Sequence, residues 1–300
     1  MFRHMMPKMG DPAMFERPTP VGFFFEPKLD GIRVFIYKEK DNLTIVNQQG
    51  IDITFKFPEL LDLPIYIKPE KCVLDGIITV LKEGRPDSKL IQKRELAETS
   101  ASIRNRTKRF PVTLFVFDIL EFGKAPLTQD WIKKRKEILE KTVKNSDIIQ
   151  IMPSVLNGRA VWEEIKEKNY FGVVAKTING KYLEGINWGW LKIKHREILN
   201  AIIIGYTEEE FLLAVYNPYH LKYIGSVKKD KDLKTFFNKK IKFLKSKTFL
   251  AQIPKSKWLK PAIVAKIEHK GWEDGKLKNP RLLRVCLDKH PDSCVIKDEI

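Results

Sequence analysis

A lysine, a carboxylate, a glycine and an arginine stand at fixed spacing between two apolar runs of the sequence. They are Lys28, Asp30, Gly31 and Arg33, in the segment Glu26-Pro27-Lys28-Leu29-Asp30-Gly31-Ile32-Arg33. A free lysine amine is protonated at neutral pH, so it becomes a nucleophile for phosphorus or carbon only when neighbouring cations or desolvation lower its pKa. Taken alone, so short a motif is more often a surface lysine in an Asp-Gly turn. The rest of the chain decides between the two.

The apolar runs that flank this segment are predicted to be strands. Residues 21–25 precede it and residues 32–37 follow it, and both runs have the length and composition of short strands. Lys28 would then lie where the backbone passes between two packed segments, with its amine directed into a cleft.

Length and net charge limit the number of domains and the kinds of partner that this chain can have. A chain of 300 residues divides more naturally into two domains than it forms one. Its 55 basic and 38 acidic side chains leave a formal net charge of +17, which favours a polyanionic partner, nucleic acid first. A basic surface that serves only solubility or a hot environment is the alternative.

The cysteines indicate a reducing compartment. Cys72, Cys286 and Cys294 are an odd number, which argues against a disulfide framework and for a cytoplasmic protein. Cys286, His290 and Cys294 are evenly spaced, but close cysteine pairs and a fourth ligand are lacking, so we do not expect zinc. We expect no membrane association, because no apolar stretch is long enough to span a bilayer and charges interrupt the Met-rich start.

Strands and helices are predicted to alternate up to about Lys194. Residues 1–20 read as an extended arm, and strands are expected at 73–80 and 112–120. Apolar positions recur at helical spacing over residues 131–143, with Thr128 as a candidate cap.

After Lys194 the pattern changes to closely spaced strands, which are predicted at residues 199–206, 211–216, 223–227 and 263–267. An amphipathic, basic helix is expected at residues 233–244, as a cover for the end of a small barrel. Five strands with one inserted helix are typical of an oligonucleotide-binding (OB) barrel.

Further segments follow the lysine in a fixed order. They are Thr54–Leu60 (TFKFPEL), Leu74–Ile78 (LDGII), Leu114–Leu120 (LFVFDIL), Gly172–Lys176 (GVVAK), Trp190–Lys194 (WLKIK), Pro280–Arg284 (PRLLR) and Asp288–Lys289. With these segments the chain resembles the ATP-dependent DNA ligases, particularly the ligase module of bacterial and archaeal end-joining systems. The resemblance extends from Phe24 to Cys294 and rests on the order and spacing of the motifs.

The resemblance implies an α+β fold in two domains. Residues 1–194 would form an adenylyltransferase domain with antiparallel sheets, and residues 195–300 an OB-fold domain. Lys28 would attack the α-phosphorus of ATP to give a lysyl-AMP, with Mg²⁺ or Mn²⁺ as the metal. The AMP would pass to a DNA 5′-phosphate, and a 3′-hydroxyl would displace it to seal the strand.

The resemblance also assigns roles to nucleotide-binding side chains. Phe117 would cover one face of adenine and Val173 the other, with Glu26 near the base edge. Arg33 would hold the ribose, and Asp30 would orient the lysine loop.

Further cations would neutralise the phosphates. Lys192 and Lys194 lie two residues apart on a predicted strand, so both project to one face, and the resemblance places them on the α-phosphate. There they would also depress the pKa of Lys28. Arg284, Asp288 and Lys289 match the family's last motif, which orients the pyrophosphate leaving group.

Four positions depart from the family pattern. Ile77 and Phe171 stand where the family has glutamates, and Gln48 and Asn187 stand where it has arginines. The two acids normally bind ribose hydroxyls or metal, so the metal ligands are unknown here. Glu26, Asp75 and Asp118 are the nearest replacement acids by sequence. These losses leave open a catalytically impaired protein that only binds DNA ends or nicks.

A third interpretation is an mRNA capping guanylyltransferase, which shares the lysine motif and the 284–289 pattern. The segments 54–60 and 190–194 favour the DNA ligases. The expected partners are nicked or broken duplex DNA and, as in end-joining systems, other end-joining proteins. We expect the chain to act as a monomer.

Overall fold

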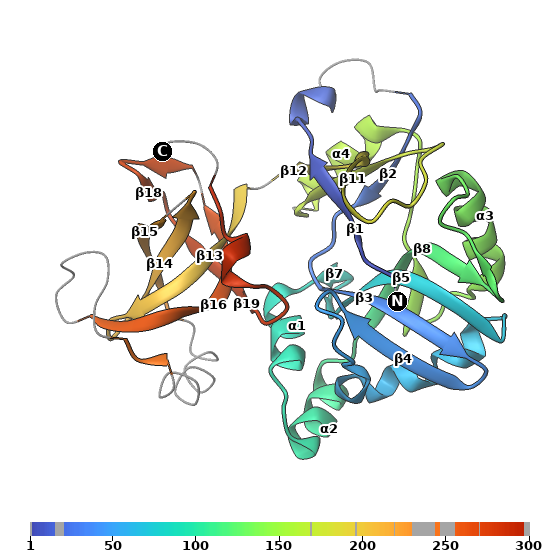
Figure 1. Cartoon of the computed structure of the whole chain (residues 1–300), viewed down its shortest axis with the longest axis horizontal. Helices are drawn as coiled ribbons and strands as arrows, with labels where there is room; N and C mark the ends of the chain where they lie inside the picture. The colour runs from blue at the N-terminus through green and yellow to red at the C-terminus, as the bar shows by residue number, and fades with distance from the viewer. Residues whose placement is uncertain are drawn as a thin grey trace. The chain divides into compact units, whose positions relative to one another are not determined.

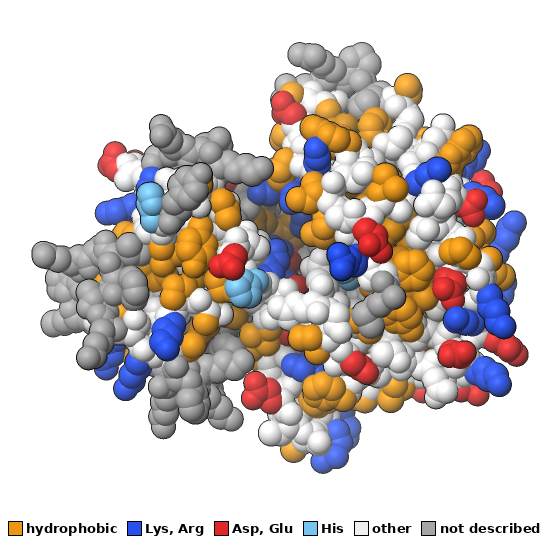
Figure 2. Space-filling model, viewed as in Figure 1, with side chains coloured by type: hydrophobic (Ala, Val, Ile, Leu, Met, Phe, Trp, Pro, Cys, Tyr) orange, Lys and Arg blue, Asp and Glu red, His pale blue; other side chains and the backbone are white. Residues whose placement is uncertain are grey.

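The structure is a computed structural model that describes residues 2–15, 21–168, 170–195, 197–218, 220–229, 244–246, 256–269 and 271–296. The chain divides into two compact units, Met1–His195 and Arg196–Ile300 (Figure 1). Figure 2 shows lysine and arginine side chains distributed over the visible surface of both units, as the excess of 55 basic over 38 acidic residues requires.

Two sheets form the framework of the first unit. The four-stranded sheet has the order β1 (Met5–Met9), β12 (Gly185–Lys194), β11 (Gly172–Thr177), β2 (Phe23–Pro27). The six-stranded sheet has the order β10 (Ile149–Ile151), β8 (Thr113–Phe122), β5 (Lys71–Thr79), β3 (Ile32–Glu39), β4 (Asn42–Asn47), with β9 (Ala125–Pro126) paired to β8. Most neighbouring strands are antiparallel, as expected, but β1 pairs with β12 and β10 with β8 in parallel.

Helices and short turns cover these sheets. They are α1 (Ser88–Glu95), α2 (Ser100–Arg109), α3 (Ile132–Thr142), α4 (Gly158–Glu167), the 3₁₀ segments η1 (Pro12–Phe15), η2 (Thr54–Lys56) and η3 (Pro58–Tyr66), and the hairpin of β6 (Leu81–Lys82) with β7 (Arg85–Pro86). No described helix is long and apolar enough to cross a membrane.

Side chains that accept from the first free backbone N–H groups fix three of the helix starts. Asp87 caps α1, Thr99 caps α2 and Asn157 caps α4. The predicted cap of α3 is wrong: Trp131 precedes that helix without a side-chain cap. The carbonyl of Thr128 instead accepts from the backbone N–H of Tyr182 at 2.9 Å.

The predicted extended arm contains a strand that the sequence pattern does not reveal. Met5 in β1 is fully buried and pairs with Gly185 in β12. The pairing jumps from Pro7 opposite Asn187 to Lys8 opposite Leu191. A strand so short and irregular, whose partner lies far along the chain, leaves no local periodicity to detect.

The second unit is a small five-stranded barrel. Its strand order is β15 (His220–Lys228), β14 (Glu210–Asn217), β13 (Glu197–Tyr206), β16 (Lys257–His269), β19 (Arg281–Cys286), and the two end strands of this order also lie close together. The hairpin of β17 (Trp272–Glu273) with β18 (Lys276–Leu277) and the turn η4 (Pro291–Ser293) complete it. The predicted helix at residues 233–244 lies outside the described residues except for Leu244. The α+β class with an OB barrel is confirmed.

Candidate active site

Lys28 lies at the crossing between the two sheets of the first unit. β2 ends at Pro27 in the four-stranded sheet, and β3 begins at Ile32 in the six-stranded sheet. The backbone N–H of Lys28 donates to the carbonyl oxygen of Gly172 at 2.8 Å. The lysine is therefore held on a short, fixed link whose two ends belong to different layers.

Asp30 anchors this link to the start of α1. The hydroxyl of Ser88 donates to Asp30 Oδ2 at 2.5 Å, and the hydroxyl of Thr79 donates to the carbonyl oxygen of Asp30 at 2.8 Å. A Cβ on Gly31 would lie 2.3 Å from the carbonyl oxygen of Ile78, so only glycine fits there. These contacts explain the Asp-Gly pair as a device that fixes the loop of the lysine.

Strand register places several site residues on one face of the four-stranded sheet. Val174 lies opposite Glu26 on one neighbouring strand and opposite Lys192 on the other. Lys176 lies opposite Trp190, and Gly172 lies opposite Lys194. Because side chains alternate along a strand, the face that carries Glu26 also carries Lys176, Lys192 and Lys194.

Val173 lies on the other face of that sheet. Its side chain is fully buried with Phe25, Trp162 and Ile193 in the core beneath α4. The expectation that Val173 covers adenine is therefore wrong, because a one-residue step along a strand reverses the face. Val174, the next residue of β11, lies between Glu26 and Lys192 on the face that carries the other predicted site residues.

Phe117 of β8 lies within reach of this face. Its ring packs edge-on against Trp190, with ring centroids 5.8 Å apart. The ammonium of Lys176 lies 4.1 Å from the centroid of Phe117 and 4.2 Å from that of Trp190, which is the distance of a cation–π contact. The aromatic predicted to stack on adenine thus faces a buried lysine.

Glu26 is buried between two lysines. Lys136 of α3 forms a short hydrogen bond to one carboxylate oxygen, and Lys176 Nζ lies 2.7 Å from the other. Burial alone would raise the pKa of Glu26, but the two ammonium groups bring it below the ordinary value. Burial lowers the pKa of Lys176 to about 8, against the opposing attraction of Glu26.

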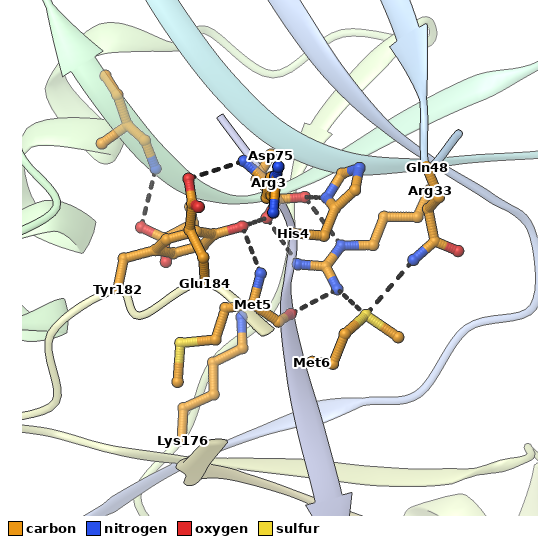
Figure 3. Close-up of polar contacts among 12 residues, drawn as sticks. Arg3, His4, Met5, Met6, Arg33, Gln48, Asp75, Lys176, Tyr182 and Glu184 are labelled. Atoms are coloured by element: carbon orange, nitrogen blue, oxygen red, sulfur yellow. Dashed lines mark hydrogen bonds and ion pairs between the residues drawn. The ribbon is translucent and has the colours of Figure 1, made fainter. Parts of the chain in front are cut away.

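Arg33 and Asp75 form the centre of a buried polar network (Figure 3). Arg33 donates through Nε and Nη2 to the two oxygens of Asp75 at 3.0 and 2.7 Å, and through Nη1 to the carbonyl oxygen of Met5 at 2.8 Å. The hydroxyl of Tyr182 donates to Asp75 at 2.8 Å, and His4 Nδ1 lies 3.6 Å from it. Arg33 therefore ties β1 to the six-stranded sheet, a role that the sequence did not predict.

The ionised form of Asp75 is strongly stabilised in this network. Burial would raise the pKa of Asp75, but Arg33 and His4 hold it well below the usual range of a carboxyl. Gln48, which stands in place of a family arginine, donates to the sulfur of Met6 at 3.5 Å and so also supports β1.

The three acids named as replacements do not fit a metal site. Glu26 and Asp75 are engaged as described, and Asp118 receives Nε and Nη2 of Arg135 at 2.7 and 2.9 Å. Phe171 is buried with its ring centroid 6.0 Å from Lys28 Nζ, where it offers no ligand. In the part of the chain that the structure describes, no three potential ligands gather for a metal ion.

The last predicted site residues lie in the second unit. Arg284 of β19 and Asp288 are both buried, with Nη1 and Oδ1 4.0 Å apart. Lys289, the next residue, is partly exposed. Within that unit the pair lies at the end of β19 and just beyond it.

Sequence reasoning missed the cations that face the buried acids. Arg135 and Lys136 belong to α3, and both are buried. They lie between Ile132 and Leu139 at the spacing of the apolar face. Charged residues at such positions were the available signal, but nothing in the sequence shows which acids they meet.

Comparison with known proteins identifies the family. Residues 9–194 match the ATP dependent DNA ligase domain, and residues 207–289 match the ATP dependent DNA ligase C terminal region. The SPbeta prophage-derived DNA ligase-like protein LigB of Bacillus subtilis is 29% identical over 197 residues, which cover 64% of this chain and 69% of that protein. A DNA ligase of Thermococcus fumicolans is 26% identical over 301 residues, covering 89% of this chain and 52% of that enzyme.

A solved structure extends the similarity to the whole fold. Mycobacterial DNA ligase D complexed with ATP and MES matches with a TM-score of 0.71 at 21% identity, over 99% of this chain and 98% of that one. This chain spans only 42% and 34% of two further archaeal DNA ligases. Since the ligase domain match alone covers residues 9–194, the chain belongs to the ATP-dependent DNA ligase family.

Proposed function

We propose that this chain seals breaks in duplex DNA, with Lys28 as the nucleophile that accepts AMP from ATP. The observation that carries the proposal is the position of Lys28 on the link between two sheets, fixed to Gly172 at 2.8 Å. Lys192 and Lys194 lie on the sheet face of Glu26 and Val174, on the strand next to Gly172. The nucleophile and its neutralising cations thus share one framework.

Each transfer exchanges one phosphoryl-type bond. Lys28 Nζ forms a bond to the α-phosphorus of ATP as pyrophosphate leaves, and the amine loses its proton. The 5′-phosphate of DNA then takes the AMP from Lys28, and a 3′-hydroxyl displaces AMP to join the strand. The residues named here position the groups and neutralise charge, with Val174 and Phe117 proposed to flank the base.

The support for this chemistry from Arg33, Asp30 and Glu26 is indirect. Asp30 fixes the loop of the lysine through Ser88, and Arg33 fixes strand β1 to the six-stranded sheet through Asp75. We propose that Mg²⁺ or Mn²⁺ enters with the ATP phosphates, because Glu26, Asp75 and Asp118 are already paired. Arg284, Asp288 and Lys289 are proposed to orient the pyrophosphate.

The proposal includes an intracellular monomer that acts on nicked or broken duplex DNA alongside end-joining proteins. All three cysteines are free and buried, which suits a reducing compartment.

Incubation with α-labelled ATP and Mg²⁺ or Mn²⁺, followed by denaturing electrophoresis, tests the central step. We expect label on the wild-type protein and on a Lys68→Ala control, whose side chain is exposed in the same unit, but none on Lys28→Ala. Label that persists in Lys28→Ala would overturn the assignment. No label with either metal would instead favour a protein that only binds DNA ends or nicks, and label from GTP would indicate a guanylyltransferase.

A further inference from the structure

We infer that the exposed face of helix α2 is a docking surface for the phosphate backbone of duplex DNA beside the break. This inference rests on the proposed ligase function and adds a surface that none of the motif residues uses. α2 has the sequence SASIRNRTKR and contains four cationic side chains and no acidic one. Figure 2 shows lysine or arginine side chains at the tip of the first unit that α2 forms in Figure 1.

Three of the four cations point into solvent. Arg104, Lys108 and Arg109 are exposed, whereas Ile103 is the buried residue of α2. Arg106 differs, because its Nη1 donates to the carbonyl oxygen of Lys93 and so fixes α2 to α1. The exposed three form what we call the α2 basic face: Arg104, Lys108 and Arg109.

Helix electrostatics accounts for only part of this face. The helix macrodipole favours cations within the last turn, where Lys108 and Arg109 lie, but Arg104 precedes that turn. Helix α3 shows the usual arrangement. Its exposed surface carries Glu137 and Glu140 as well as lysines, and Lys134 pairs with Asp130 at 2.8 Å. The α2 basic face lacks such compensation along its own helix, so a polyanion complements it.

The helix pair is connected to the reacting lysine. α1 begins at Ser88, whose hydroxyl is bonded to Asp30 at 2.5 Å. The eight residues of α1 span about 12 Å at about 1.5 Å per residue. α1 therefore carries the chain about 12 Å from the lysine loop toward α2, which corresponds to roughly three to four base pairs of duplex.

The composition of α2 favours the backbone of duplex DNA over single-stranded DNA as the bound partner. Proteins that hold single strands combine cations with aromatic side chains on which bases stack, and α2 contains no aromatic residue. Phosphate contacts of this kind do not read base sequence. The occupant is thus the backbone of double-stranded DNA, contacted irrespective of sequence.

The test is the salt dependence of binding of the full chain to a nicked duplex. Counterion release lowers the logarithm of the affinity with the logarithm of salt, by about 0.9 per phosphate contact. We expect Arg104→Gln/Lys108→Gln/Arg109→Gln to reduce this slope by up to about 2.7. The matched control, Lys133→Gln/Lys134→Gln/Lys141→Gln on α3, removes the same charge and should leave the slope near wild type.

Equal slopes for the two triple variants would overturn the inference, since net charge alone would then explain both. A larger loss on a single-stranded oligonucleotide than on duplex would overturn the choice of occupant. Arg104→Gln alone, with an expected slope change of about 0.9, keeps the test valid if the triple variant does not fold. AMP transfer to Lys28 needs no DNA and should be unchanged in all variants, so its failure would count against the proposed function and not against this surface.

Discussion

The backbone N–H of Lys28 donates to the carbonyl of Gly172 at 2.8 Å, which fixes the proposed nucleophile beside Phe171. The ring centroid of Phe171 lies 6.0 Å from Lys28 Nζ. A Cβ on Gly31 would lie 2.5 Å from Cγ2 of Ile77. Both residues that replace family glutamates therefore lie close to the lysine loop, where their apolar side chains offer no oxygen ligand for a metal ion.

We predict that Ile77→Glu combined with Phe171→Glu accelerates AMP transfer to Lys28. The pair would restore carboxylates at both positions, and charge neutralisation by a metal is worth several kcal/mol in such reactions, so we expect a gain of at least about tenfold. Electron paramagnetic resonance should also detect Mn²⁺ binding without nucleotide in the double variant but not in wild type. A folded double variant with unchanged rate and no Mn²⁺ signal would contradict this reading.

Substitutions at two neighbouring valines should have different effects, one on stability and the other on nucleotide binding. Val173 is fully buried beneath α4, so Val173→Ala should lower the free energy of unfolding by about 2 kcal/mol. Val174 lies between Glu26 and Lys192, so Val174→Ala should leave stability nearly unchanged and raise KM for ATP about fivefold, the equivalent of about 1 kcal/mol. Denaturant unfolding and self-adenylation kinetics measure the two effects. The reverse outcome would return Val173 to the adenine site.

Asp75 is predicted to be essential for the fold of the first unit. Asp75→Asn would leave the guanidinium of Arg33 buried without its paired carboxylate, and removal of one partner of a buried ion pair costs about 3–5 kcal/mol. Asp62→Asn, at an exposed acid of the same unit, should change stability by less than about 0.5 kcal/mol. Urea unfolding compares the two. An effect of Asp75→Asn as small as that of Asp62→Asn would contradict this prediction, because the buried guanidinium of Arg33 would then need no carboxylate.

The motif residues and the fold class were predictable, because motif order and strand patterning are local properties of the sequence. Lys28, Asp30 and Gly31 lie in one loop, as their spacing indicates, and Lys192 and Lys194 share a face because residues two apart on a strand do so. The assignment of Val173 failed for the same geometric reason. Similarity to a family identifies the segment that lines the site, but only strand register decides which of two adjacent residues in it faces the site.

The buried polar pairs were not predictable. Lys136 meets Glu26 across 110 positions of sequence, and the hydroxyl of Tyr182 meets Asp75 across 107. Such pairs depend on how separate elements pack, which a single sequence does not encode in any local pattern. Two of the replacement acids, Glu26 and Asp118, are paired with Lys136 and Arg135, which the sequence did not indicate. The third, Asp75, is paired with Arg33 of the lysine motif.

Lys176 should give the protein a distinctive alkaline pH dependence. Its pKa is lowered to about 8 from 10.5, chiefly by burial. Between pH 8 and pH 10.5, Lys176 is therefore protonated in the unfolded chain and largely neutral in the folded one. The free energy of unfolding should accordingly rise with pH from about 8 to about 10.5. The contribution is at most about 3.5 kcal/mol, because each pKa unit is worth about 1.4 kcal/mol.

Lys176→Met removes the titrating amine and should flatten this rise, which denaturant unfolding at several pH values would measure. Lys181→Met, at an exposed lysine of the same unit, serves as the control and should keep the wild-type profile. Glu26 retains Lys136 in the Lys176→Met variant, so its carboxylate stays paired over this range. A wild-type profile that falls between pH 8 and 10 relative to Lys176→Met would mean that the ammonium stabilises the fold. The pair with Glu26 would then outweigh the cost of burying Lys176.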